Sequence, residues 1–179
     1  MSRIGKKPIL LPKGIKATVT NSSITLESAK NKMHLAIPNN IEVSTEGESI
    51  FVKRLNNTKL SKSLHGTIRM LIHNMIKGLT EGFKKELDII GVGYKAQVKG
   101  NNLTISVGFS HAVEIPIPQG LKVSTPNPNR VIVEGFDKQK VGEFSANLRR
   151  IYPPEPYQGK GIRYVGEEVR KKLGKALAK

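Results

Sequence analysis

Short apolar segments separated by turn-forming residues fill the first third of the chain and then give way to a longer periodic pattern. The segments at 24–26, 34–37, 41–43 and 50–52 are three or four residues long, with Asn, Gly, Ser and Pro between them. Such spacing predicts short strands joined by turns. From residue 60 to residue 79, Leu, Ile or Met recurs every three or four positions, which predicts a helix. Thr58 is its predicted N-cap, and Gly78 and Gly82 are stop signals.

The second half of the chain follows the same plan. Apolar segments at 94–98 and 103–107 flank Lys-Gly-Asn-Asn, which predicts a β-hairpin, and further segments follow at 113–117, 121–123 and 131–133. A second helix is predicted to begin after Asp137, a good N-cap, and to end at Pro153 and Pro154. Its predicted buried residues are Val141, Phe144, Leu148 and Ile151.

The two halves align with each other at an almost constant offset of 79 to 81 residues. Segment 24–26 matches 103–105, segment 41–45 matches 121–125, and 50–53 matches 131–134. The helices match through Leu64, Ile68, Arg69 and Leu71 against Phe144, Leu148, Arg149 and Ile151. Four blocks in the same order indicate a duplicated module. We predict an α+β protein of two tandem modules, 1–82 and 83–179, each a small, mainly antiparallel sheet packed on one helix, with basic terminal extensions.

Charge narrows the choice of partner. The chain has 30 Lys and Arg against 14 Asp and Glu, a net charge of +16. Residues 1–16 carry +5 without an acid, and residues 148–179 carry nine cations and three acids, or +6. Such basic ends on a less basic body predict binding to a polyanion, which leaves nucleic acid, an anionic membrane or an acidic protein. The alternative is that the lysines lie on well-solvated surfaces and bind no partner.

Several classes of function find no support in the sequence. Cysteine is absent, the four histidines have no metal-ligand spacing, and no phosphate-binding or nucleophile motif occurs, so we predict no enzyme, metal or cofactor. No apolar stretch resembles a signal peptide or a membrane span, so we predict a cytoplasmic protein. Residues 165–179 could form a helix with a thin apolar stripe, which is only weak support for membrane binding. Alternatively, they could stay disordered until RNA neutralises their charge.

Residues 153–164, Pro-Pro-Glu-Pro-Tyr-Gln-Gly-Lys-Gly-Ile-Arg-Tyr, combine a stiff entry with cations and aromatic rings. Lys160 and Arg163 are suited to phosphate oxygens, and the flanking glycines would allow a phosphate to approach the backbone. Tyr157 and Tyr164 could stack on bases or bond to sugars. The segment therefore predicts contact with RNA, although a loop with solvated charges would share its composition.

This segment resembles the signature of bacterial large-subunit ribosomal protein six, in which Pro-Glu-x-Tyr precedes Gly-Lys-Gly. The opening Ser-Arg-Ile-Gly-Lys-Lys-Pro-Ile at 2–9, Gly-Val-Gly-Tyr-Lys-Ala at 91–96 and Gly-Phe-Ser-His at 108–111 resemble further landmarks of that family. The resemblance extends over about 2–170, with one departure at Gln158, where the family usually has Lys. It implies a structural protein of the large subunit that binds 23S rRNA, near the stalk base where translation GTPases dock and among neighbouring ribosomal proteins.

We therefore predict that the second module and its tail make the main RNA contacts, while the first acts as a spacer and protein-binding surface. A separate N-terminal contact would become ordered only on binding. A DNA-binding architectural protein and an RNA-modifying enzyme remain alternatives. The predicted RNA-binding residues are Arg3, Lys6, Lys7, Arg149, Arg150, Tyr157, Gly159, Lys160, Gly161, Arg163, Tyr164, Arg170, Lys171 and Lys172.

Overall fold

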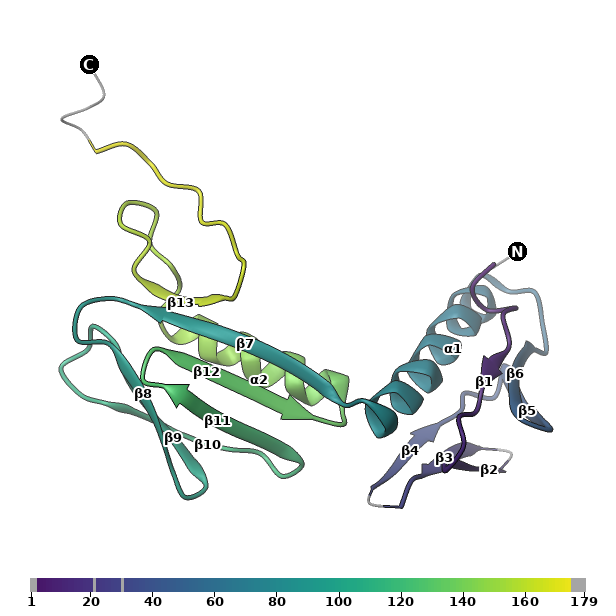
Figure 1. Ribbon diagram of the computed structural model, residues 1–179. Coiled ribbons are helices and arrows are strands. Elements are labelled where there is room, and N and C mark those ends of the chain that lie inside the picture. Colours follow the sequence, from purple (N-terminus) through teal and green to yellow (C-terminus); the bar gives the residue numbers. More distant parts are fainter. Residues whose placement is uncertain (1–2, 21, 30, 175–179) are drawn as a thin grey trace. The chain divides into compact units, whose positions relative to one another are not determined.

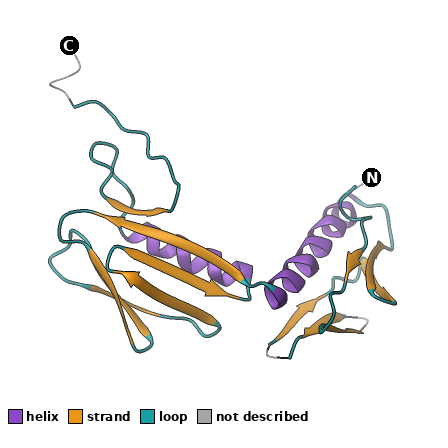
Figure 2. Ribbon diagram, in the orientation of Figure 1, coloured by secondary structure: helices purple, strands orange, loops and turns teal. Residues whose placement is uncertain are grey.

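A computed structural model describes residues 3–20, 22–29 and 31–174 of the chain. The chain divides into two compact units, and the division falls between Gly82 and Phe83. Each unit contains one α-helix and short antiparallel strands (Figures 1 and 2).

The first unit contains two three-stranded antiparallel sheets and helix α1 (Lys59–Thr80), which follows the last strand (Figure 1). One sheet has the order β1-β6-β5 and the other the order β2-β3-β4. The strands are β1 (Ile9–Leu10), β2 (Lys16–Thr20), β3 (Ser23–Glu27), β4 (Lys32–Ala36), β5 (Ile41–Glu46) and β6 (Ser49–Arg54).

Helix α1 begins at the predicted N-cap and ends before Gly82, but Gly78, the other predicted stop signal, is buried within the helix. The Thr58 hydroxyl accepts a hydrogen bond from Ser61 N at 3.2 Å, and Gly82 follows the helix with a φ of +75°. Leu60 and Leu71, which fit the predicted spacing, are 58% and 39% exposed. The buried residues of α1 are Ser61, His65, Ile68, Ile72, Met75, Ile76 and Gly78. Apolar residues therefore also lie on the exposed side of α1, and two polar residues, Ser61 and His65, lie on its buried side.

The second unit has a four-stranded antiparallel sheet, β11-β12-β7-β13, a three-stranded sheet, β10-β9-β8, and helix α2 (Lys138–Ile151). The predicted hairpin joins β8 to β9, and the Asp137 carboxylate caps α2 by accepting from Gln139 N at 2.9 Å. The strands are β7 (Phe83–Ile90), β8 (Lys95–Lys99), β9 (Asn102–Ser106), β10 (Val113–Pro116), β11 (Leu121–Asn127), β12 (Arg130–Gly135) and β13 (Gly161–Tyr164).

The predicted fold class and duplication are confirmed, with two sheets in each unit rather than one. Strands β2-β3-β4 correspond to β8-β9-β10, and β5-β6 correspond to β11-β12. Strand β1 pairs with β6 as β7 pairs with β12. Strand β13 has no counterpart among the described residues of the first unit. The second unit therefore carries an additional element, formed by the last part of the segment that resembles the family signature.

Strand β7 accepts this extra partner, whereas the first unit flanks the equivalent edge with proline. Leu11 N donates to Glu48 O at 2.8 Å. The backbone nitrogens of the alternate residues Pro8, Leu10 and Pro12 therefore point away from β6, toward the open edge of the sheet. The two prolines have no N–H to offer an added strand. On the outer side of β7, Val165 N donates to Glu86 O at 3.1 Å. The sequence prediction missed β7 because three charged residues, 84–86, interrupt its apolar pattern; β1, β2 and β13 were also missed.

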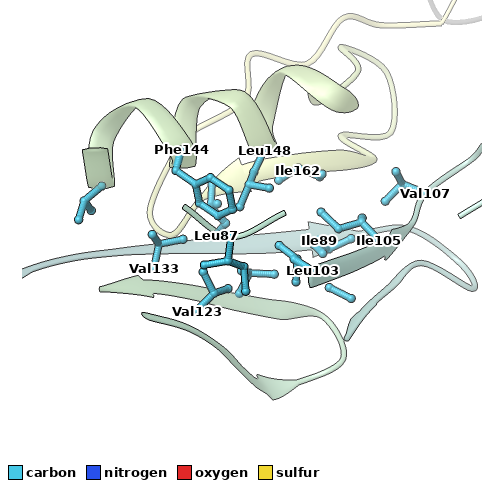
Figure 3. Packing of buried hydrophobic residues seen from close by; sticks show 14 residues of the cluster. Leu87, Ile89, Leu103, Ile105, Val107, Val123, Val133, Phe144, Leu148 and Ile162 are labelled. Carbon is cyan, nitrogen blue, oxygen red and sulfur yellow. The ribbon is translucent and has the colours of Figure 1, made fainter. Parts of the chain in front are cut away.

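Strand β13 is anchored in the core of the second unit. Ile162 is buried together with Leu87 and Ile89 of β7, and with Phe144 and Leu148 of α2 (Figure 3). These residues form one apolar cluster between the four-stranded sheet and the helix. Because the side chain of Ile162 is buried in this cluster, the chain on either side of Ile162 is held against the second unit.

Candidate nucleic-acid interface

The segment between α2 and β13 is a closed loop. Glu155 N donates to Lys160 O at 2.9 Å, and Gly159 N donates to Glu155 O at 3.1 Å. At the base of the loop, Ile162 N donates to Tyr152 O at 2.8 Å. Figure 1 shows this loop projecting from the end of α2 beside β13. The predicted stiffness of the segment thus comes from hydrogen bonds as well as from its prolines.

Both glycines of Gly-Lys-Gly are needed by the loop itself. Gly161 has a φ of +137°, and a methyl group on it would lie 2.7 Å from Pro153 O and 2.8 Å from the Cα of Pro154. Gly159 is buried and has a φ of +73°. Gly161 is therefore required by a close approach of the chain to itself, while contact of either glycine with phosphate stays a prediction.

The predicted contact residues of the loop differ in availability. Lys160 and Arg163 are half-buried. Tyr157 is 57% exposed and is open to stacking on a base. Tyr164 packs against the core, and Lys85 Nζ lies 5.5 Å from the centre of its ring. Tyr157 is therefore the better placed of the two rings for RNA.

Arg149, at the end of α2, is bound to a carboxylate. Its Nε lies 3.1 Å from Glu167 Oε2, and its second terminal nitrogen lies 2.5 Å from Oε1. Glu167 Oε2 also accepts a hydrogen bond from Tyr164 N at 3.0 Å. The hydrogen bond with Arg149 holds the pKa of Glu167 below its usual value and raises the pKa of Arg149. Arg150, the next residue, is exposed.

The lowered pKa of Glu167 gives an expected pH dependence. Protonation is harder in the folded protein, so the carboxylate contributes stability above the ordinary pKa of 4.5. That contribution should disappear as the pH falls through the lowered pKa. The difference in unfolding free energy between wild type and Glu167→Gln should therefore shrink below pH 4.5, as measured by denaturant titrations at several pH values. An equal difference at pH 7 and pH 3 would contradict this assignment.

The basic tail after β13 lies against the loop. Lys172 N donates to Pro156 O at 2.7 Å. Residues 165–174 contain no helix, so the helical alternative for the tail is not found over this range. The remainder of that segment, with Lys175, Leu177 and Lys179, lies outside the described residues. The side chains of Arg170, Lys171 and Lys172 are exposed. The predicted cations of the tail are thus brought close to the predicted loop.

The two internal landmarks of the second unit meet at the entrance of the loop. The ring of Tyr152 makes edge contacts with Tyr94 and Phe109, each with ring centres 5.7 Å apart. A hydrogen bond with Tyr152 raises the pKa of the Tyr94 hydroxyl. Gly108, at a φ of +54°, leaves room for these rings. This support was not foreseen from sequence, because the three rings come from segments that are far apart along the chain.

The N-terminal cations occupy a defined place on the first unit. Arg3, Lys6 and Lys7 are exposed, but Gly5 is buried against the ring of His65. Arg69 of α1 donates to the carbonyl oxygen of Lys7 at 3.4 Å. Residues 5–8 therefore pack on the unit, in contrast to the predicted arm that becomes ordered only on binding.

Lys6 also lines a pocket of about 500 Å³ with two cations that are not among the predicted RNA-binding residues. Lys53 and Arg54 come from the end of β6, and Phe51 contributes an aromatic wall. Their signal in the sequence is only a Lys-Arg pair after a strand. Tertiary structure is needed to place it beside the N-terminus.

Over the ranges 3–20, 22–29 and 31–174, no group of three or more His, Cys, Asp or Glu side chains is arranged to hold a metal ion. In the same part of the chain, neither helix is both long and apolar enough to cross a membrane.

Comparison with known proteins gives full-length similarities. The family model described as ribosomal protein L6 matches residues 11–82 and 90–165, one segment in each compact unit. The large ribosomal subunit protein uL6 of Moorella thermoacetica is 46% identical over 179 residues, which cover all of this chain and 98% of that protein. The proteins of the same name from Gemmatimonas aurantiaca and Spiroplasma kunkelii are each 45% identical over 179 residues, and both chains are covered completely.

Proposed function

Because the chain belongs to the ribosomal protein L6 family, we propose that it is a structural component of the large ribosomal subunit and binds 23S rRNA through its second unit. The family match confirms the resemblance found in the sequence, together with the prediction of a non-catalytic protein of translation.

The main support for an RNA contact in the second unit is that the basic tail lies against the loop between α2 and β13. The hydrogen bond from Lys172 N to Pro156 O brings the exposed cations of the tail to the loop that holds Lys160. Neither segment alone combines so many cations with an exposed tyrosine. Phosphates of a folded RNA would be contacted by these cations, and an unpaired base could stack on Tyr157.

The first unit has a more limited part in this proposal. Its hairpin of β5 and β6 carries the exposed acids Glu42, Glu46 and Glu48, which phosphate would repel. This surface is suited to neighbouring ribosomal proteins or to a translation GTPase. The cations at residues 3–7 make a separate RNA contact, with Lys53 and Arg54 next to Lys6.

The family resemblance also supports a finer location as part of the proposal. We place the protein in cytoplasmic ribosomes, near the stalk base and the region where translation GTPases dock, with the modules 1–82 and 83–179 as its two domains. Crosslinking in cells, followed by identification of the attached RNA and proteins, tests this location. Recovery of RNA other than 23S rRNA would contradict it.

Replacing both Lys160 and Arg163 with alanine is expected to flatten the salt dependence of RNA binding. Each lost phosphate contact should reduce the slope of log K against log salt by about 0.7 to 0.9. The measurement is a titration of a 23S rRNA transcript with the full chain at several KCl concentrations. An unchanged slope would remove the loop from the interface.

Two controls accompany this titration. Lys99→Ala removes an exposed lysine from the β8–β9 hairpin, and its slope should match that of wild type. Substitution of Glu42 and Glu46 should hardly weaken binding; a severe loss would mean that the roles of the two units are reversed.

Competition with duplex DNA decides between rRNA binding and the DNA-binding alternative, because a preference for DNA would contradict the proposal.

A further inference from the structure

The Arg149–Glu167 ion pair is an unexpected feature of a strongly basic surface. It joins the last turn of α2 to the start of the tail, 18 residues further on. The Glu167 carboxylate accepts three hydrogen bonds: Arg149 donates two, and Tyr164 N, at the end of β13, donates the third. The side chains of Arg149 and Glu167 are only 35% and 25% exposed. A carboxylate in this position fixes the direction in which the chain leaves β13.

The tail crosses the loop a few residues after this ion pair. Lys172 N donates to Pro156 O, and a methyl group on Gly159 would lie 3.8 Å from Cε of Lys171. The Lys171 side chain therefore lies over Gly159, the residue before Lys160. Glu167, which lies between β13 and Lys172 along the chain, is bound to Arg149 of α2.

We infer that Glu167 is a positioning residue for RNA binding, which holds the tail against the loop so that Lys160, Lys171 and Lys172 form one cationic surface. Arg149 is its partner and acts through it, rather than by contacting phosphate directly. This inference rests on the proposed function, because it concerns how the same surface is built. It also gives an acidic residue a favourable role in binding an acidic ligand.

The sign of one mutational effect separates this inference from ordinary electrostatics. Removing an acid from a protein that binds RNA should strengthen binding, since a source of repulsion is lost. If Glu167 positions the tail, Glu167→Gln should instead weaken binding, because the contacts of the tail with phosphate are no longer held in place. At about 0.1 M salt, the expected loss is roughly tenfold for each phosphate contact that is lost.

Glu168 provides a matched control, because it is the adjacent residue, carries the same charge and is exposed. Glu168→Gln should bind a 23S rRNA transcript as tightly as wild type or more tightly. Both variants are measured as full chains, with a circular dichroism melt to show that each is folded. Exchange of the Lys172 amide proton gives a second measurement, and it should become faster in Glu167→Gln but stay unchanged in Glu168→Gln.

The outcomes are distinct. If wild type does not bind the transcript, the proposed function fails. If wild type binds, and Glu167→Gln binds as tightly as Glu168→Gln, the positioning role of Glu167 is overturned while the proposed function stands. In a double-mutant cycle, Arg149→Gln with Glu167→Gln should weaken binding no more than Glu167→Gln alone. A further additive loss would show that Arg149 contacts RNA itself.

Discussion

Leu148→Ala is expected to lower the free energy of unfolding of the second unit by about 3 kcal/mol, within the usual 2–5 kcal/mol for a buried leucine. Leu148 is only 1% exposed and lies in the cluster that joins α2 to the four-stranded sheet (Figure 3). Its removal leaves a cavity next to Ile162, so the anchor of β13 is weakened as well. Denaturant titration measures the loss of unfolding free energy, and amide hydrogen exchange in β7 and β12 assigns it to the second unit.

Leu60→Ala is the matched control, because it is the same substitution on the exposed side of a helix. Leu60 is 58% exposed, and its replacement should change stability by no more than about 0.5 kcal/mol. Equal losses for the two substitutions would show that the buried face of α1 is assigned wrongly. The comparison matters because both leucines fit the apolar spacing of a predicted helix, and only the structure shows that one is buried and the other exposed.

Gly161→Ala should destabilise the second unit by about 2–4 kcal/mol. A side chain at a φ of +137° is strained, and the added methyl group would lie 2.7 Å from Pro153 O, an atom of the backbone that cannot rotate away. The same change should reduce affinity for a 23S rRNA transcript, since the loop and β13 must move apart. Denaturant titration and RNA titration of the same preparation measure the two effects.

Gly142→Ala serves as the control for this substitution. Gly142 lies within α2, has no positive φ and has nothing within 4 Å of an added methyl group. Alanine should therefore raise stability by about 0.5–1 kcal/mol, because it favours the helix. A similar loss at both glycines would mean that the close contact of Gly161 with Pro153 is not the cause.

Sequence patterns predicted those elements whose signals are local. The hairpin at 99–102 and the caps at Thr58 and Asp137 depend on residues within a few positions of each other, and all three are present in the structure. Strand β7 was missed because its stability comes from two neighbouring strands and not from its own apolar pattern. The apolar spacing of α1 likewise does not reveal its buried face, since this depends on which side the sheets cover.

The same distinction applies to the candidate site. The sequence indicated which segments are cationic, but not which cations are committed to the fold. Arg149 looked equivalent to Arg150 until the structure paired it with Glu167. Gly161 looked like an opening for phosphate until the structure placed Pro153 against it.

The duplication, the α+β class, the basic ends and the resemblance to a ribosomal protein family could all be predicted from the sequence, because repeats, periodicity and charge depend only on the order of residues along the chain. The folded structure was needed to show that β13 pairs with β7, that rings from three distant segments meet at the loop, and that Glu167 is bound to Arg149. These contacts join residues far apart along the chain. Their energies depend on burial and geometry that exist only after the chain has folded.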